Sequence, residues 1–267
     1  MICRWWNIGL GALFFCMIGL IGTTYVRAKS MNAENFFSNQ QLAAYHFAQQ
    51  GETERLAQAV RAGVDLNSPG KEDMTLLGLA VLTAERRAIV NLMRAGANPN
   101  QVIRDAGSPA ILAITKHFNP PRNEAVAALL DGGYDPNQLL GEGKPYLFYF
   151  VDCNHWPGLN LALNRGGNIN VRRNNGKSLL TYIIEGGDYA QARELVIAGA
   201  DVTARSERNE TALLAIDYDI SNANPLTVNV WREMLTLREL ILSKLADPKD
   251  RHTAFTDVAE RKIQQNP

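Results

Sequence analysis

A glycine close to an aspartate or asparagine recurs along this chain at a nearly constant interval. The copies align on Gly63, Gly96, Gly133, Gly167 and Gly199, with successive spacings of 33, 37, 34 and 32 residues. Each glycine follows an apolar, helix-like run, where the end of a helix needs a residue that tolerates a positive φ angle. The Asp or Asn that comes next can hydrogen-bond its own backbone and begin a turn. Such a stop, repeated with a period near 33 residues, predicts a chain built from stacked helical repeats.

A second pattern begins about a dozen residues after each stop. It is an apolar run, and its copies span residues 75–81, 108–114, 144–150, 178–184 and 211–217. In four copies a Thr or Ser opens the run, as is typical of a helix N-cap, and Pro at the next position suits the first helical turn. Together the two patterns resemble the ankyrin repeat, whose motif runs Thr-Pro-Leu-His-x-Ala, then two short helices, then Gly-Ala-Asp. The resemblance covers about residues 39–245 and implies an all-α solenoid of about six helix-turn-helix repeats with short hairpin tips.

One position of the ankyrin motif is replaced in every copy. The place of the motif histidine is taken by Gly78, Ile111, Leu147, Thr181 and Leu214. In the family this histidine ties adjacent repeats together through hydrogen bonds. We therefore expect packing, rather than hydrogen bonding, to hold the repeats of this chain together.

The first 28 residues form a segment of their own, because residues 5–26 carry no charge. Arg4 before the apolar core and a small-residue site ending at Ala28 fit a cleaved signal peptide. The same 22 uncharged residues are also enough to cross a bilayer as an uncleaved hydrophobic helix. Arg27 and Lys29, directly after the core, disfavour efficient cleavage and favour the membrane anchor slightly, but both interpretations stay open. Either one predicts that the repeats lie outside the cytoplasmic membrane, in a bacterial periplasm.

The remaining chain is expected to divide into a tether at 29–38, the repeat domain at 39–246 and a polar C-terminal tail at 247–267. The whole chain has 27 basic and 27 acidic residues, so its formal charge is zero. A nucleic-acid partner is not expected, because such proteins usually carry a basic surplus. Cys153 stands alone after residue 28, so no disulfide is expected within the repeats.

The sequence contains no motif that indicates an enzyme. It lacks a Gly-x-Ser-x-Gly elbow, a His-Glu-x-x-His pair, a phosphate-binding glycine loop and a Cys-x-x-Cys pair. Its four histidines fall in different repeats or in the tail, without the spacing of metal ligands. We therefore expect no catalytic residue, no metal, no cofactor and no small-molecule substrate.

Protein binding is the function that these features favour, since helical repeat arrays present an extended concave surface. The motif register places four large apolar residues where the first helices would face that groove: Leu79, Leu112, Phe148 and Tyr182. Apolar and aromatic groups are common interface anchors. On this interpretation, Phe148→Ala or Tyr182→Ala weakens partner binding by about 2 kcal/mol or more. The alternative is that these side chains pack between repeats, and the sequence does not decide between the two.

Charged residues are expected at the hairpin tips, where they would form a rim of mixed sign around the groove. The candidate partner-binding residues at the tips are Arg104, Asp105, Lys144, Arg172, Arg173, Arg205 and Arg208. Each of them could instead be solvated surface charge, which contributes little to affinity.

An export or anchor segment followed by degenerate ankyrin repeats resembles bacterial periplasmic ankyrin proteins. Among these are immunity proteins that accompany phospholipase effectors of type VI secretion systems. The resemblance implies a protein that binds a lipase effector and blocks it, with the membrane contacted through residues 5–26 if they are retained. The alternative is a periplasmic scaffold that stabilises or anchors an envelope enzyme.

Overall fold

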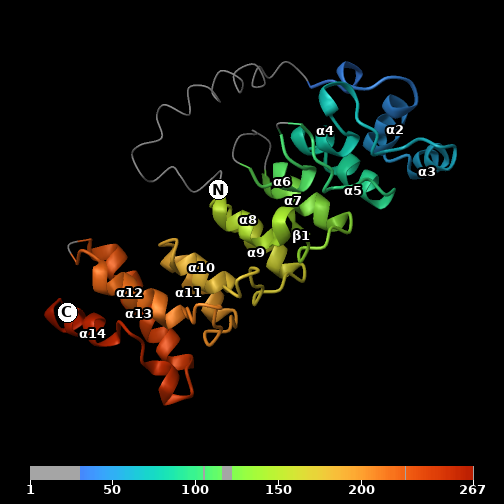
Figure 1. Ribbon diagram of the computed structural model, residues 1–267. Helices are drawn as coiled ribbons and strands as arrows, with labels where there is room; N and C mark the ends of the chain where they lie inside the picture. The colour runs from blue at the N-terminus through green and yellow to red at the C-terminus, as the bar shows by residue number, and fades with distance from the viewer. Residues whose placement is uncertain (1–30, 105, 116–121, 226, 267) are drawn as a thin grey trace. The chain divides into compact units, whose positions relative to one another are not determined.

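The computed structural model of the chain describes residues 31–104, 106–115, 122–225 and 227–266. These residues fold into helix pairs joined by tight turns (Figure 1), which confirms the all-α prediction. The chain divides into two compact units. Unit 1 comprises Met1–Pro136 and Tyr149–Gly166, and unit 2 comprises Asn137–Phe148 and Gly167–Pro267.

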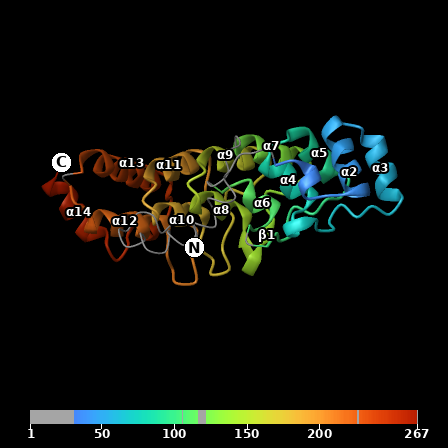
Figure 2. The same ribbon diagram turned by 90° about the horizontal axis from the view of Figure 1, so that it is seen from above.

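Unit 1 is built from helices that lie in two layers. Its α-helices are α2 (Asn39–Gln50), α3 (Thr53–Arg61), α4 (Leu76–Leu82), α5 (Arg86–Arg94), α6 (Pro109–Leu112), α7 (Arg122–Asp131) and α9 (Trp156–Asn164), with short 3-10 turns at Ala33–Asn35 and Lys71–Asp73. Helix α8 (Tyr146–Asp152) begins in unit 2 and ends in unit 1. Figure 2 shows α5, α7 and α9 side by side in one layer and α4 beside α6 in the other.

Unit 2 repeats this plan and ends in a helical cap. Its elements are β1 (Leu139–Leu140), a 3-10 turn at Gly141–Gly143, β2 (Lys144–Pro145), α10 (Leu179–Ile184), α11 (Tyr189–Ile197), α12 (Ala212–Asn222), α13 (Val228–Lys244), a 3-10 turn at Pro248–Arg251 and α14 (Thr256–Gln265). The two short strands pair antiparallel in the first hairpin tip. Helix α10 packs on α12, and α11 packs on α13.

The predicted helix stops are present, with one correction to their register. Gly63, Gly96, Gly133 and Gly199 all have positive φ angles between 96° and 100°. In the fourth copy, however, Gly166 rather than Gly167 adopts the left-handed conformation, with φ of 94°. Because α9 ends at Asn164, only Gly166 stands where the chain must reverse. The last two spacings therefore become 33 and 33 residues, and the repeat is more regular than the sequence alignment indicated.

Three of the four predicted hydroxyl N-caps are found at the first helices, whereas Ser108 makes no side-chain capping hydrogen bond. The hydroxyl oxygens of Thr75, Ser178 and Thr211 each accept a hydrogen bond from a backbone N–H three residues later, at 3.0 to 3.1 Å. Each bond satisfies one of the free N–H groups in the first helical turn.

Hydrogen bonds, and not packing alone, connect adjacent repeats, which corrects the expectation drawn from the missing histidine. The last Asn of a stop motif accepts a hydrogen bond from the backbone N–H of the next motif. Asn67 bonds Asn98 at 2.7 Å, and Asn170 bonds Asp201 at 2.8 Å. The same arrangement links Asn137 to Asn168 at 2.7 Å. This Asn ladder replaces the ties that the motif histidine supplies in the ankyrin family.

The bulky side chain of Phe150 in α8 packs against a glycine of α9. Phe150 is fully buried, and a Cβ atom added to Gly158 would lie 2.7 Å from its ring. Glycine at the start of α9 therefore makes the room that Phe150 occupies. Cys153, at the end of the same apolar stretch, is buried, as expected of a small core residue.

The segments on both sides of the repeats pack against them. Phe37, from the predicted tether, is buried and stacks on Tyr45 with ring centroids 6.4 Å apart. After residue 247 the chain forms α14, which packs against α12. The hydrophobic segment at 5–26 lies outside the described residues. Within the part of the chain that the structure describes, no helix combines the length and apolarity needed to cross a membrane.

A carboxyl group between α11 and α12 makes the stability of unit 2 depend on pH. Burial raises the pKa of Asp219 from 3.8 to about 6, although the hydroxyl of Tyr189 donates a hydrogen bond to it at 3.1 Å. The folded state therefore holds this proton more tightly than the unfolded state, so the contribution to stability is full below pH 4 and is lost as the pH rises to 6. We expect Asp219→Asn to stabilise the chain by about 2 kcal/mol at pH 8 and to change little at pH 4. Urea unfolding at both pH values measures this, and an equal effect at the two would contradict it.

Candidate partner-binding surface

The hairpin tips of unit 2 form the candidate binding surface. The first tip is the β1–β2 hairpin, in which Leu140 pairs with Lys144. The second tip closes at Arg172 and Ser178, and in its turn the backbone N–H of Gly176 donates to the carbonyl of Arg173 at 2.8 Å. In the third tip, the backbone N–H of Ser206 donates to the carbonyl of Glu210 at 3.0 Å.

These three tips are joined to one another. The side-chain amide of Asn174 donates to the carbonyl of Glu142 in the first tip at 3.1 Å. The backbone N–H of Glu207 in the third tip donates to the carbonyl of Asn175 at 3.0 Å. Gly176 permits this approach, because its φ angle is 74° and an added Cβ would lie 3.4 Å from the Ser206 and Glu207 backbone. The tips are thus held in fixed positions, which lowers the entropy that a binding partner must overcome.

Basic side chains share this surface with the exposed carboxylates of Glu142 and Glu207. Arg172, Arg205 and Arg208 are exposed, while Arg173 and Lys144 are half-buried. Arg172 lies 3.6 Å from the carboxylate of Asp201 and also donates to the carbonyl of Arg205 at 3.2 Å. Five basic groups of one unit thus lie on neighbouring tips, as the sequence predicted.

An ion-pair network connects the second and third tips. Lys177 contacts the carboxylates of Glu185 at 2.6 Å and Glu210 at 3.0 Å. Burial acts to lower the pKa of Lys177, but its hydrogen bonds with Glu185 and Glu210 outweigh burial and raise the pKa above its usual value. The same contacts hold the pKa of Glu210 below its usual value, against the effect of burial. Lys177, which the sequence analysis did not single out, is therefore a structural cation of the tips.

The four residues expected to line an apolar groove are buried inside the protein instead. Leu79 and Phe148 are 0% exposed, Leu112 is 3% exposed and Tyr182 is 9% exposed. The physical reason is that the first helices are surrounded by neighbouring elements, so that every residue of α4 and α10 is buried. These side chains therefore pack between repeats, which was the alternative interpretation of the sequence.

The aromatic pair of unit 2 is also covered by a tip residue. The rings of Phe148 and Tyr182 lie 5.2 Å apart. The Arg173 guanidinium carbon lies 5.8 Å from the first ring centroid and 5.3 Å from the second. Such cation–π contacts fix the arginine over the rings. The second tip thus presents a positive charge where the sequence predicted an apolar groove.

In unit 1, Arg104 is exposed and pairs with the carboxylate of Asp73 at 2.7 Å. Asp105 lies outside the described residues. The structure therefore groups Lys144, Arg172, Arg173, Arg205 and Arg208 in unit 2, and it places Arg104 in unit 1.

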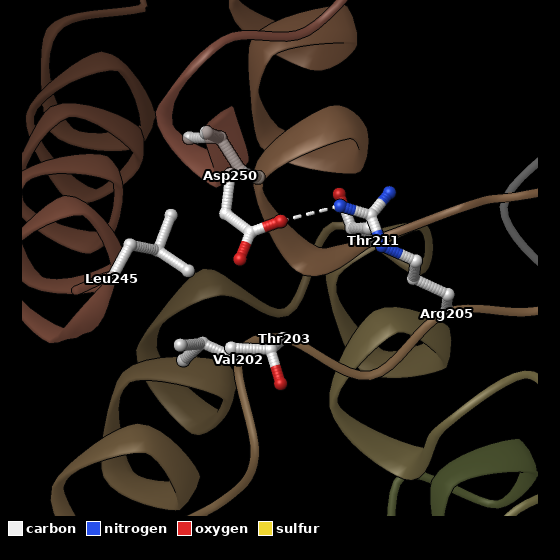
Figure 3. Close-up of a pocket in the computed structure, with 7 residues that line it drawn as sticks. Val202, Thr203, Arg205, Thr211, Leu245 and Asp250 are labelled. Carbon is white, nitrogen blue, oxygen red and sulfur yellow. Dashed lines mark hydrogen bonds and ion pairs between the residues drawn. The ribbon is translucent and has the colours of Figure 1, made fainter. Parts of the chain in front are cut away.

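A small depression lies beside the third tip (Figure 3). Val202, Thr203, Leu245 and the ion pair between Arg205 and Asp250 surround it, and the pair is 2.5 Å long. Its volume is about 10 Å³, which is the space that a single water molecule needs. The depression is too small for a small-molecule substrate. The ion pair between Asp250 and Arg205 links the third tip to the C-terminal cap. Among residues 31–104, 106–115, 122–225 and 227–266, no three His, Cys, Asp or Glu side chains are grouped to hold a metal ion.

Comparisons with known proteins identify the fold. No family model matches the sequence. The chain is 24% identical over 185 residues to the human mitochondrial disaggregase; this match covers 66% of the chain and 24% of the relative, so it spans about a quarter of that protein.

Three solved structures are similar to this chain. An ankyrin-repeat domain from Acinetobacter baumannii has a TM-score of 0.50 at 18% identity, over 75% of this chain and 96% of that one. The ankyrin-repeat domain of human ASB11 has a TM-score of 0.49 at 18% identity, over 84% and 97% of the two chains. A chain from the Bdellovibrio bacteriovorus complex of a predatory endopeptidase with an immunity protein has a TM-score of 0.45 at 17% identity, over 76% and 98%. The first of these, together with the repeat register, identifies an ankyrin-repeat fold.

Proposed function

We propose that this chain is a non-enzymatic immunity protein of the bacterial periplasm, which binds a secreted phospholipase effector and blocks it. The ankyrin-repeat fold is that of a protein–protein interaction module. The observation that carries the binding role is the row of hairpin tips in unit 2, where basic groups are exposed on a hydrogen-bonded support. The apolar segment at 5–26 and the resemblance to periplasmic ankyrin proteins support the location and the immunity role.

The proposed mechanism is stoichiometric. The exposed arginines of the tips are positively charged, and guanidinium groups can form paired hydrogen bonds with carboxylates. A partner with an acidic rim around its substrate entrance would therefore be held in one orientation, with the tips covering the entrance. Fixed tips favour this role, because little conformational entropy is lost on binding.

The test is protection of cells in a co-expression experiment. A phospholipase effector encoded beside this chain is directed to the periplasm, with and without the full chain. We expect growth to be restored by the full chain and not by a chain that lacks residues 5–26. Killing that persists when both proteins reach the periplasm would overturn the immunity role. Co-purification without protection would favour a scaffold that anchors an envelope enzyme.

A further inference from the structure

An open groove on the second-helix layer of unit 1 is lined by arginines. Its wall is α5, with Arg86, Arg87, Val90, Asn91 and Arg94, and its edge is Asp131 at the end of α7. The groove is shallow and open to solvent. It lies far along the chain from the tips of unit 2, and the proposed function does not use it.

The charges around this groove are unbalanced. Asp131 forms ion pairs with Arg86 and with Arg165, which follows the end of α9. The backbone carbonyl of Asp131 accepts a hydrogen bond from Arg94 at 3.3 Å, and Arg87 reaches the carbonyl of Gln50 at 3.4 Å. One carboxylate thus stands among four guanidinium groups. Since backbone carbonyls do not neutralise charge, the cluster keeps a formal charge of +3.

The placement of these charges is unfavourable for the isolated helices. Arg86 and Arg87 occupy the first turn of α5, directly after Glu85, which is the N-cap residue of this helix. The helix dipole makes that end positive, so cations there are destabilising. Asp131 is the last residue of α7. The C-terminal end of a helix carries the negative end of the dipole, so an anion is unfavourable there. Arg86 and Arg165 compensate Asp131, whereas Arg87 and Arg94 donate to backbone carbonyls.

We propose that this groove binds an acidic segment of a partner protein. Arg87 and Arg94 are separated by seven residues of α5, which corresponds to about 10 Å along the helix axis. A single small anion cannot reach both ends of such a row. Two carboxylates separated by two turns of an acidic helix can, and each would form a charge-assisted hydrogen bond with an exposed guanidinium. The half-buried Val90 between the two ends offers an apolar contact for the middle of that segment.

The test uses the full chain and a fluorescent peptide of eight glutamates, with a peptide of eight glutamines as the uncharged probe. The groove variant is Arg87→Gln with Arg94→Gln, which leaves the pairs of Asp131 with Arg86 and Arg165 intact. The control variant, Arg55→Gln with Arg61→Gln, removes the same charge from exposed positions on α3. We expect binding of the glutamate peptide to weaken about tenfold in the groove variant and less than twofold in the control.

Three outcomes would overturn this proposal. The first is that the full chain binds the glutamate peptide no better than the glutamine peptide. The second is an equal loss in both variants, which would mean that only net charge matters. The third is that vesicles of phosphatidylglycerol, rather than the peptide, lose binding in the groove variant, which would make the groove a contact for anionic lipid. Thermal melting of both variants checks that they fold, and none of these results depends on the tips of unit 2.

Discussion

Replacing Asp217 by alanine is expected to lower the free energy of unfolding by about 3–5 kcal/mol. Asp217 is 0% exposed and lies on α12. Its carboxylate accepts from the Arg238 guanidinium at 2.7 Å and from the hydroxyls of Thr253 and Thr256 at 2.8 and 2.6 Å. Without it, the buried Arg238 retains only a longer contact of 3.3 Å with Glu260. An unpaired buried charge is costly, and the same change also removes the hydrogen bonds that Thr253 and Thr256 donate to α12.

Urea unfolding of three variants separates this effect from simple loss of contacts. We expect Asp217→Ala combined with Arg238→Met to be more stable than Asp217→Ala alone, because an apolar pair avoids the buried charge. Glu260→Ala, at the exposed end of the same network, is expected to cost less than about 1 kcal/mol. A loss below 1 kcal/mol for Asp217→Ala, or strictly additive losses in the double variant, would contradict the network as described.

Replacing Phe148 by alanine is expected to destabilise the fold by about 3–5 kcal/mol. Phe148 is fully buried in α8, and its ring packs against that of Tyr182 at 5.2 Å. The substitution leaves a cavity between two repeats and also removes the ring on which Arg173 rests. We therefore expect Phe148→Ala to lower the stability of the fold. From the sequence alone, the same substitution could have weakened partner binding instead.

The control for Phe148 is Arg173→Ala, which removes the covering cation and leaves the aromatic pair in place. We expect it to cost about 0.5–1 kcal/mol in the same unfolding measurement. If Phe148→Ala kept its full stability and lost only its partner, the residue would be an interface anchor after all.

Much of this fold follows from local rules that can be applied to the sequence. The helix stops require a glycine at a left-handed position, and the hydroxyl residues cap the first turns, so both are visible as patterns. Asn-Gly at 175–176 is likewise a pair typical of hairpin turns, and the turn of the second tip ends at Gly176. The register of the fourth stop was wrong by one residue, because two glycines stand together there and only the end of α9 selects Gly166.

The features that could not be predicted from the sequence depend on contacts between residues far apart in the chain. The Asn ladder was encoded in the last residue of each stop motif, as at Asn67 and Asn170, but its partner lies 31 residues away. The burial of Leu79 and Tyr182 depends on how closely neighbouring repeats pack, which motif register alone does not specify. The charged tips were predictable because turns lie at the surface. The arginine groove was not, since Arg86, Asp131 and Arg165 come from three different repeats.

The affinity of the full chain for the phospholipase effector that we propose as its partner, measured by calorimetry, tests the proposed role of the tips most directly. The tip variant is Arg172→Ala with Arg208→Ala. Its matched control is Arg193→Ala with Arg232→Ala, at exposed positions on α11 and α13 of the same unit. We predict a one-to-one complex whose affinity falls about tenfold or more in the tip variant and less than twofold in the control. A tip variant that binds like the unchanged chain, or a control that loses as much, would contradict the conclusion that the tips bind the partner.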